Sequence, residues 1–330
     1  MSYTIAGTEH HLVDLGDVTL SVHEARPATD DADRPLVVFS HGFPELAFSW
    51  RRQLAAVAAA GYRAIAPDQR GYGGSSRPGA IADYDIHPLT GDLAALLDHF
   101  EAERAVFVGH DWGGFVVWQM PLLHRDRVAG VVGVNTPYLP RMPVRPTEVF
   151  RMIGGDDFYI LEFQEPGVAD EILARDVPGL FDALLRRAVS PEEVARVAEA
   201  NPPGSDGLTT FERVIAAPRL GELFVTPEEM AVYVDTFTET GFTGGINWYR
   251  NFDRNWETTP ELDGARIDGI PCLMVTAAWD PVLVPALAQG MPDVIGDLEL
   301  HELPGCGHWT PTERADELNS LLVDWLGRKC

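Results

Sequence analysis

Short apolar runs that alternate with helical segments constrain the fold of this chain more than any other feature. The runs lie at residues 36–40, 62–66, 105–108, 128–134 and 272–276 and end in polar or turn-forming residues, as strands buried on both faces do. Between them, residues 48–60, 89–100 and 115–124 carry apolar side chains at helical spacing. Strands that alternate with helices predict a mostly parallel central sheet flanked by helices on both faces, which is the α/β class.

The alternation is interrupted once, over residues 138–270, where acidic, proline-punctuated helical stretches such as 191–200 and 227–238 carry no strong strand signal. It resumes at Pro271 and closes with a strand at 298–303 and an amphipathic helix at 314–326. At the other end of the chain, residues 11–15 and 18–23 predict an antiparallel hairpin on the sheet edge. We therefore expect a core domain made of residues 1–138 and 262–330, with a helical cap at residues 139–261 inserted into it.

The net charge disfavours two classes of partner. The 330 residues contain 25 Lys plus Arg against 50 Asp plus Glu, and the net charge of −25 disfavours nucleic acid and anionic membrane surfaces. Lys329 is the only lysine. A GC-rich genome and adaptation to salt both explain this composition, and the sequence leaves the two open.

The cysteines and the N-terminus give no sign of a secreted or membrane protein. Cys272, Cys306 and Cys330 form neither an even disulfide framework nor a cluster with metal-ligand spacing. Residues 1–17 lack the basic and apolar regions of a secretion signal, and no run of about 18 apolar residues could span a bilayer. We expect a cytoplasmic protein without a metal site.

The most informative motif follows the predicted strand 105–108. Ligands of open parallel sheets bind outside the carboxyl ends of the strands, and here the chain reads Gly-His-Asp-Trp-Gly-Gly over residues 109–114. Small residues on both sides of Asp111 are typical of a nucleophile elbow, in which a sharp turn lifts the nucleophile clear of the backbone. A lone Asp before a helix is often only a cap, but the flanking glycines favour a nucleophile.

Two further strand ends carry polar residues of the right type. Asp280 follows the strand 272–276, and His308 lies in Gly-Cys-Gly-His-Trp after the strand 298–303. Each alone would be assigned a structural role, Asp280 in a turn before a proline and His308 among aromatic residues. Together they give the chain order nucleophile, acid, histidine, which is that of the triads of α/β hydrolases.

Two further segments follow the first two predicted strands of the core. At residues 41–45, His-Gly-Phe-Pro-Glu, the backbone N–H of Phe43 is expected to form an oxyanion hole with that of Trp112. Residues 68–75, Asp-Gln-Arg-Gly-Tyr-Gly-Gly-Ser, lack the ending of a phosphate-binding loop and are interpreted as structural.

Taken together, these motifs resemble those of epoxide hydrolases of the α/β-hydrolase fold. The resemblance covers nearly the full length and includes Phe-Gln-Glu-Pro-Gly-Val-Ala at 163–169 and Asn-Trp-Tyr-Arg-Asn at 247–251. It implies that the inserted region is a cap that supplies two tyrosines, Tyr159 and Tyr249, to hold the epoxide oxygen. It also implies apolar pocket walls, formed here by Phe43, Trp112 and Trp248.

The resemblance assigns a role to each residue of the predicted site. Asp111 attacks an epoxide carbon and forms an alkyl ester, and His308, oriented by Asp280, activates the water that hydrolyses the ester to a vicinal diol. No cofactor or metal is needed, and the expected partner is a small apolar epoxide. His110 and Glu45 lie within these motifs and receive no role. A homodimer is left open.

Two other functions compete with this interpretation. A haloalkane dehalogenase also uses an Asp nucleophile followed by Trp, but halide leaves without a proton, so Tyr159 and Tyr249 would have no function. A non-catalytic binding protein on the same scaffold would be expected to lack a member of the triad, and all three are present here. The motifs do not identify the natural epoxide or the selectivity.

Overall fold

An eight-stranded sheet forms the centre of the computed structural model, which describes residues 3–29, 34–156, 158–200 and 208–330. The strand order is β1-β2-β4-β3-β5-β6-β7-β8. The strands are β1 Glu9–Asp14, β2 Thr19–Ala25, β3 Leu36–Ser40, β4 Ala64–Asp68, β5 Ala105–His110, β6 Val128–Val134, β7 Ile267–Ala277 and β8 Ile295–Leu303. β1 and β2 pair antiparallel at one edge, β2 is antiparallel to β4, and all the other pairs are parallel.

This sheet confirms the predicted α/β class and the edge hairpin. The strands buried on both faces, such as β3 and β5, have no exposed side chain, which explains why they appear in the sequence as unbroken apolar runs. The parallel strands bring their carboxyl ends to one edge of the sheet, so the residues that follow β3, β5, β6, β7 and β8 become neighbours.

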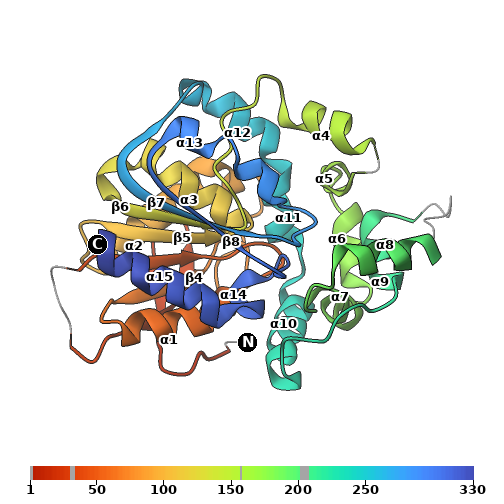
Figure 1. The fold of residues 1–330 in the computed structure, drawn as a ribbon, viewed down its shortest axis with the longest axis horizontal. Helices are drawn as coiled ribbons and strands as arrows, with labels where there is room; N and C mark the ends of the chain where they lie inside the picture. The colour runs from red at the N-terminus through yellow and green to blue at the C-terminus, as the bar shows by residue number, and fades with distance from the viewer. Residues whose placement is uncertain (1–2, 30–33, 157, 201–207) are drawn as a thin grey trace.

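Helices of the core cover both faces of the sheet (Figure 1). α1 and α15 pack against each other on one face, and α2 and α3 on the other. The helical segments of the core are η1 Ala47–Trp50, α1 Arg51–Ala59, η2 Ile81–Tyr84, α2 Ile86–His99, α3 Trp112–Leu123, η3 Arg125–Arg127, η5 Pro285–Ala288, α13 Met291–Val294, α14 Thr310–Glu313 and α15 Ala315–Lys329. Gly61, with φ +91, lies just beyond α1, as predicted from its sequence position.

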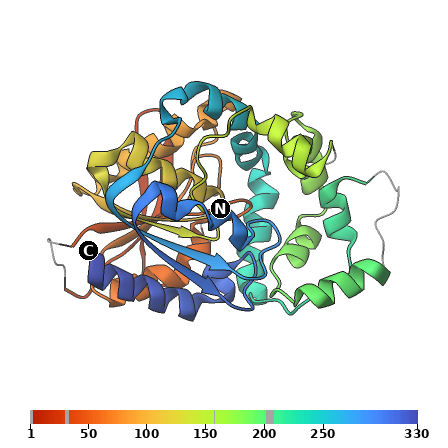
Figure 2. The ribbon, with the colours of Figure 1, turned by 45° about the horizontal axis from the view of Figure 1, so that its top comes forward.

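In the described residues between β6 and β7, helices joined by loops are the only regular elements, apart from one isolated bridge between Arg186 and Leu223. Its helices gather beyond the carboxyl ends of the strands (Figures 1 and 2). They are α4 Pro146–Gly154, α5 Tyr159–Glu162, α6 Val168–Ala174, α7 Val177–Leu184, α8 Pro191–Ala200, α9 Thr210–Ala216, α10 Pro227–Thr240, α11 Thr243–Arg250, α12 Phe252–Thr258 and η4 Pro260–Leu262. This is the arrangement expected of an inserted cap, and the domain limits at 138 and 262 stay a prediction.

Several polar contacts dock this cap on the core, among them contacts from α10 and from the end of α11. From α10, Tyr233 shares a hydrogen bond of 3.0 Å with Ser49, and Glu229 accepts one of 2.8 Å from Arg51. Beyond α11, the Asn251 amide donates to the carbonyl of Ile81 over 2.6 Å. The cap is therefore held on either side of the strand ends. Among the described residues, no helix is long and apolar enough to cross a membrane.

Candidate active site

Asp111 occupies a strained turn between β5 and α3. Its backbone has φ +50 and ψ −122, a conformation that residues with a side chain rarely adopt. The small neighbours are required by close backbone packing: a Cβ on Gly109 would lie 2.2 Å from the carbonyl oxygen of Gly113, and one on Gly113 would lie 2.0 Å from that of Ser40. The glycines predicted from the elbow pattern are thus explained by contact with β3 and with the turn itself.

Backbone amides hold the Asp111 carboxylate. The N–H of Phe43 donates to Oδ1 over 2.8 Å, and the N–H of Trp112 also bonds to the carboxylate. Burial raises the pKa of Asp111 above its ordinary 3.8, although the charges of His308 and His110 and the two amides oppose this. The two N–H groups predicted to form an oxyanion hole therefore meet at the carboxylate of Asp111.

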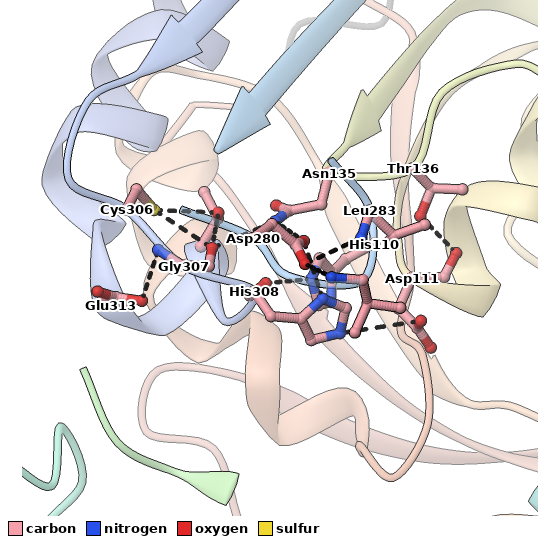
Figure 3. Close-up of polar contacts among 12 residues, drawn as sticks. His110, Asp111, Asn135, Thr136, Asp280, Leu283, Cys306, Gly307, His308 and Glu313 are labelled. Carbon is pink, nitrogen blue, oxygen red and sulfur yellow. Dashed lines mark hydrogen bonds and ion pairs between the residues drawn. The ribbon is translucent and has the colours of Figure 1, made fainter. Parts of the chain in front are cut away.

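His308 stands between two carboxylates (Figure 3). Its Nδ1 lies 2.9 Å from Asp280 Oδ2, whereas its Nε2 lies 3.8 Å from Asp111 Oδ2, which is beyond hydrogen-bond range. Burial lowers the pKa of His308, but the charges of Asp280 and Asp111 outweigh it and raise the pKa to about 9. The three residues predicted from chain order are thus brought together.

Asp280 is held as a charged acceptor by four donors. The backbone N–H groups of Val282 and Leu283 reach Oδ1 over 2.9 and 3.0 Å, while His308 and Asn135 reach Oδ2. Burial raises the pKa of Asp280, yet the nearby His308 and these donors lower it well below its usual range. A permanently ionised Asp280 fixes the orientation of the His308 ring.

The two tyrosines of the cap lie next to Asp111. The ring centroids of Tyr159 and Tyr249 are 6.0 Å apart, and the two phenols hydrogen-bond each other. Burial raises both pKa values, and the charge of Asp111 is the next largest cause for each. Both phenols therefore remain protonated beside a carboxylate, as hydrogen-bond donors for an oxygen would have to be.

Asn135 and Thr136, which immediately follow β6, were not predicted as site residues. The Asn135 amide donates to Asp280 over 2.7 Å and to the carbonyl of Gly307 over 3.2 Å, and the Thr136 hydroxyl donates to the carbonyl of Asp111 over 2.8 Å. β6 lies between β5 and β7 in the sheet, so its carboxyl end separates the nucleophile from the acid. In the sequence, the signal that could have identified these two site residues is a polar pair directly after an apolar run.

His110 and Glu45, which received no role from the sequence, form a buried pair beneath the site. His110 Nδ1 lies 3.1 Å from Glu45 Oε2, and its Nε2 lies 2.7 Å from the carbonyl oxygen of His308. The same Glu45 oxygen accepts the N–H of Gly42 over 2.6 Å. Burial raises the pKa of Glu45, but His110 and the other donors outweigh this effect and lower the pKa. The pair links the turn after β3 to the turn that holds His308.

Comparisons with known proteins identify the family of this chain. Residues 35–315 match the family described as alpha/beta hydrolase fold. The chain is 47% identical over 96% of its length, and 96% of the relative, to Epoxide hydrolase A of Mycobacterium tuberculosis. This chain belongs to the epoxide hydrolase family. It is also 40% identical to the Bifunctional epoxide hydrolase 2 of Sus scrofa, over 88% of this chain but 51% of that protein.

Solved structures of this family share the whole fold. Epoxide Hydrolase A from Mycobacterium thermoresistibile superposes with a TM-score of 0.87 at 46% identity, covering 97% of this chain and 98% of that one. The epoxide hydrolase VrEH1 from Vigna radiata gives a TM-score of 0.86 at 30% identity, over 99% and 100% of the two chains.

In this member of the epoxide hydrolase family, aromatic rings surround Tyr249. Phe43, Trp112 and Phe163 lie with ring centroids 5.5, 5.0 and 4.9 Å from that of Tyr249. Trp248, predicted to line the pocket, is fully buried behind Trp112, and its indole N–H donates to the carbonyl of Arg70 over 3.3 Å. Phe43 and Trp112 thus border the ring of Tyr249, and Trp248 supports Trp112.

A separate cavity of about 140 Å³ borders Trp112. Apolar side chains of α3, α12 and the segment after β6 line most of it, including Phe115, Tyr138 and Phe252. Neither Asp111 nor His308 lines this cavity, so it extends the apolar surroundings of Trp112 and is distinct from the reacting groups.

One group in the described part of the chain has the spacing of metal ligands. Glu9, His11 and Glu24, on β1 and β2, place ligand atoms within 4.8 Å of one another. Glu24, however, already pairs with the guanidinium groups of Arg63 and Arg26, which would repel a bound cation. The polar loop at residues 68–75 is likewise occupied by internal contacts, since Arg70 bonds both oxygens of Asp92 at 2.6 Å.

Proposed function

We propose that this chain hydrolyses a small apolar epoxide to a vicinal diol through an ester on Asp111. The reaction class follows from its membership of the epoxide hydrolase family. The observation that carries the mechanism is a carboxylate beside two protonated phenols, because an epoxide needs a nucleophile at carbon and a proton donor at oxygen at the same time.

In the first step, Asp111 Oδ2 attacks an epoxide carbon and the carbon–oxygen bond breaks. The developing alkoxide takes a proton from Tyr159 or Tyr249, which are more acidic than an alcohol yet protonated at neutral pH. Oδ2 is the oxygen available for attack, because Oδ1 is bound by the Phe43 amide. The Oδ1 atom then becomes the ester carbonyl oxygen and already accepts the Phe43 amide.

In the second step, His308 takes a proton from water, and the resulting hydroxide attacks the Asp111 carbonyl carbon. Negative charge develops on Oδ1, to which the Phe43 amide donates, and the Trp112 amide bonds to the same carboxyl group. Collapse of this intermediate releases the diol oxygen, which takes up the proton held by His308, and leaves Asp111 as a carboxylic acid. Asp111 then loses its proton and the tyrosine that gave one up in the first step regains one, so the sum of the reaction is epoxide plus water to diol.

The same tyrosines weigh against a haloalkane dehalogenase. A departing halide needs N–H donors, and the Trp112 indole is already a hydrogen-bond partner of Tyr249. The residue after Gly42 is Phe43, whose side chain offers no donor. Incubation with a chloroalkane is expected to release no chloride under conditions in which an epoxide is hydrolysed.

A single turnover in ¹⁸O-water, with enzyme in excess over a styrene-type epoxide, tests the proposed mechanism. Water attacks the Asp111 carbonyl in our scheme, so one ¹⁸O should appear in the peptide that contains Asp111, and the diol should be unlabelled. A labelled diol with an unlabelled Asp111 would show that water attacks the epoxide directly and would rule out the ester.

A further inference from the structure

A buried carboxylate that the proposed mechanism does not use joins the cap to the turn that carries His308. Glu313, the last residue of α14, is only 5% exposed. Its Oε1 accepts the N–H of Ala188 over 3.0 Å, and its Oε2 accepts the N–H of Gly307 over 3.1 Å. Ala188 lies in the cap and Gly307 immediately precedes His308. Figure 3 shows the second of these bonds beside the triad.

The cap end of this link is itself rigid. Arg186 pairs with Leu223 in a bridge, and the N–H of Arg187 donates to the carbonyl of Glu222 over 2.8 Å. The guanidinium of Arg187 also donates to the backbone carbonyl of Glu313 over 3.0 Å. Ala188 therefore continues a segment that is fixed both within the cap and to the end of α14.

The other end of the link is fixed just as closely. The carbonyl of Gly307 accepts the Asn135 amide, and the carbonyl of His308 lies 2.7 Å from His110 Nε2. A Cβ on Gly307 would lie 2.5 Å from that of Ala188, so the turn is in direct contact with the cap. A shift of the cap at Ala188 would therefore displace the residue before His308.

We propose that Glu313 is a positioning residue that sets the placement of His308 by tying its turn to the docked cap. The inference rests on the proposed function, in which His308 must reach a water at the Asp111 ester. A displacement of about 1 Å in such a geometry can cost about a hundredfold in rate. Hydrolysis of the ester, which needs His308, would therefore depend on the link, whereas its formation, which needs Asp111 and the tyrosines, would not.

The chemistry of the link requires a carboxylate. Both partners are N–H donors, and an ionised carboxylate offers only acceptors. The near-isosteric Glu313→Gln change would place an NH₂ group against one of the two amides and break one end of the link. The variant thus tests the link with almost no change of volume.

The experiment is a rapid-quench single turnover that follows the alkyl-enzyme by intact mass. In Glu313→Gln we expect the rate constant for ester hydrolysis to fall about tenfold or more, with ester formation kept within about twofold, so that the ester accumulates. Glu229→Gln is the matched control, because it weakens a cap-to-core contact, the pair with Arg51, that does not touch the His308 turn. It should leave both rate constants near those of the wild type.

The outcomes separate this inference from the proposed function. If His308→Gln accumulates no ester, both the function and the inference are wrong. If His308→Gln accumulates ester but Glu313→Gln hydrolyses it at the wild-type rate, or if Glu229→Gln shows the same loss, only the role of Glu313 is overturned. Glu313→Asp provides a second variant should the first fail to fold: it keeps the charge but is too short to reach both amides, and the same selective loss in hydrolysis is expected.

Discussion

In the proposed reaction, the negative charge of Asp111 also influences the pKa of His308. In the resting enzyme, burial lowers the pKa of His308, but the carboxylates of Asp280 and Asp111 raise it to about 9, so the imidazole is protonated at neutral pH and cannot act as a base. Ester formation removes the charge of Asp111. The pKa of His308 then falls toward its ordinary 6.5, and the first step thereby prepares the base for the second.

A pH dependence follows for the second step. A general base must be unprotonated, so the rate of ester hydrolysis should rise with pH and level off, with a midpoint between 6.5 and about 9. The decay of the alkyl-enzyme in single turnovers, measured from about pH 6 to pH 10, reports this step alone. A decay rate that is constant over this range would contradict the role of His308 as the base.

The phenols of Tyr159 and Tyr249 should matter for the first step, the formation of the ester. In the proposed mechanism Tyr159 and Tyr249 donate to the epoxide oxygen only while the ring opens, so Tyr159→Phe and Tyr249→Phe should each slow ester formation about tenfold to a hundredfold and leave ester hydrolysis largely unchanged. Tyr84→Phe is a suitable control, since it removes a phenol that donates to the carbonyl of Pro78. Equal losses in both steps would assign the two tyrosines a purely structural role.

At the scale of elements, the turn from β5 into α3 depends on close contact with β3. Gly113→Ala would place a Cβ 2.0 Å from the Ser40 carbonyl, and backbone on both sides prevents relief. We expect a loss of about 3 kcal/mol in the free energy of unfolding, together with a displaced Asp111.

Urea denaturation would measure this loss, and Gly91→Ala is its control. A Cβ on Gly91 meets nothing within 4 Å, and the residue lies inside α2, so this variant should gain about 0.5 to 1 kcal/mol from helix propensity. A Gly113→Ala protein of wild-type stability would show that the turn is not constrained by β3.

Elements whose pattern is local could be predicted, and those that depend on neighbours in space could not. The strands β3, β5 and β6 were predicted from apolar runs because each is buried on both faces. α13 has four residues, too few for any periodicity, and it was not predicted.

The same distinction holds for the site. Asp111, Asp280 and His308 follow their strands in a recognisable order, whereas Asn135 takes part only because β6 lies between β5 and β7. Glu313 is a more extreme case, because its partners, Ala188 and Gly307, are 125 and 6 residues away and neither uses its side chain. No motif can reveal a carboxylate that binds two backbone amides from different parts of the chain.

On the scale of the whole molecule, the net charge of −25 bears on stability. An excess of one charge destabilises the compact state by self-repulsion, although local pairs, such as that of Arg328 with Glu299 and Asp324, oppose it. Exposed pairs of this kind contribute little to folding. We therefore expect repulsion to outweigh the attraction within these pairs. Salt screens both effects, so added salt should stabilise the protein.

The thermal midpoint should accordingly rise by a few degrees between about 0.01 and 0.5 M sodium chloride at neutral pH. Scanning calorimetry at both salt concentrations would measure the shift. The same pair of scans near the isoelectric point of about 4.6, where the net charge is small, provides the control, and the rise should disappear there because little repulsion is left to screen. A midpoint that falls with salt at neutral pH would show instead that the surface ion pairs, such as that of Arg328 with Glu299, outweigh the repulsion.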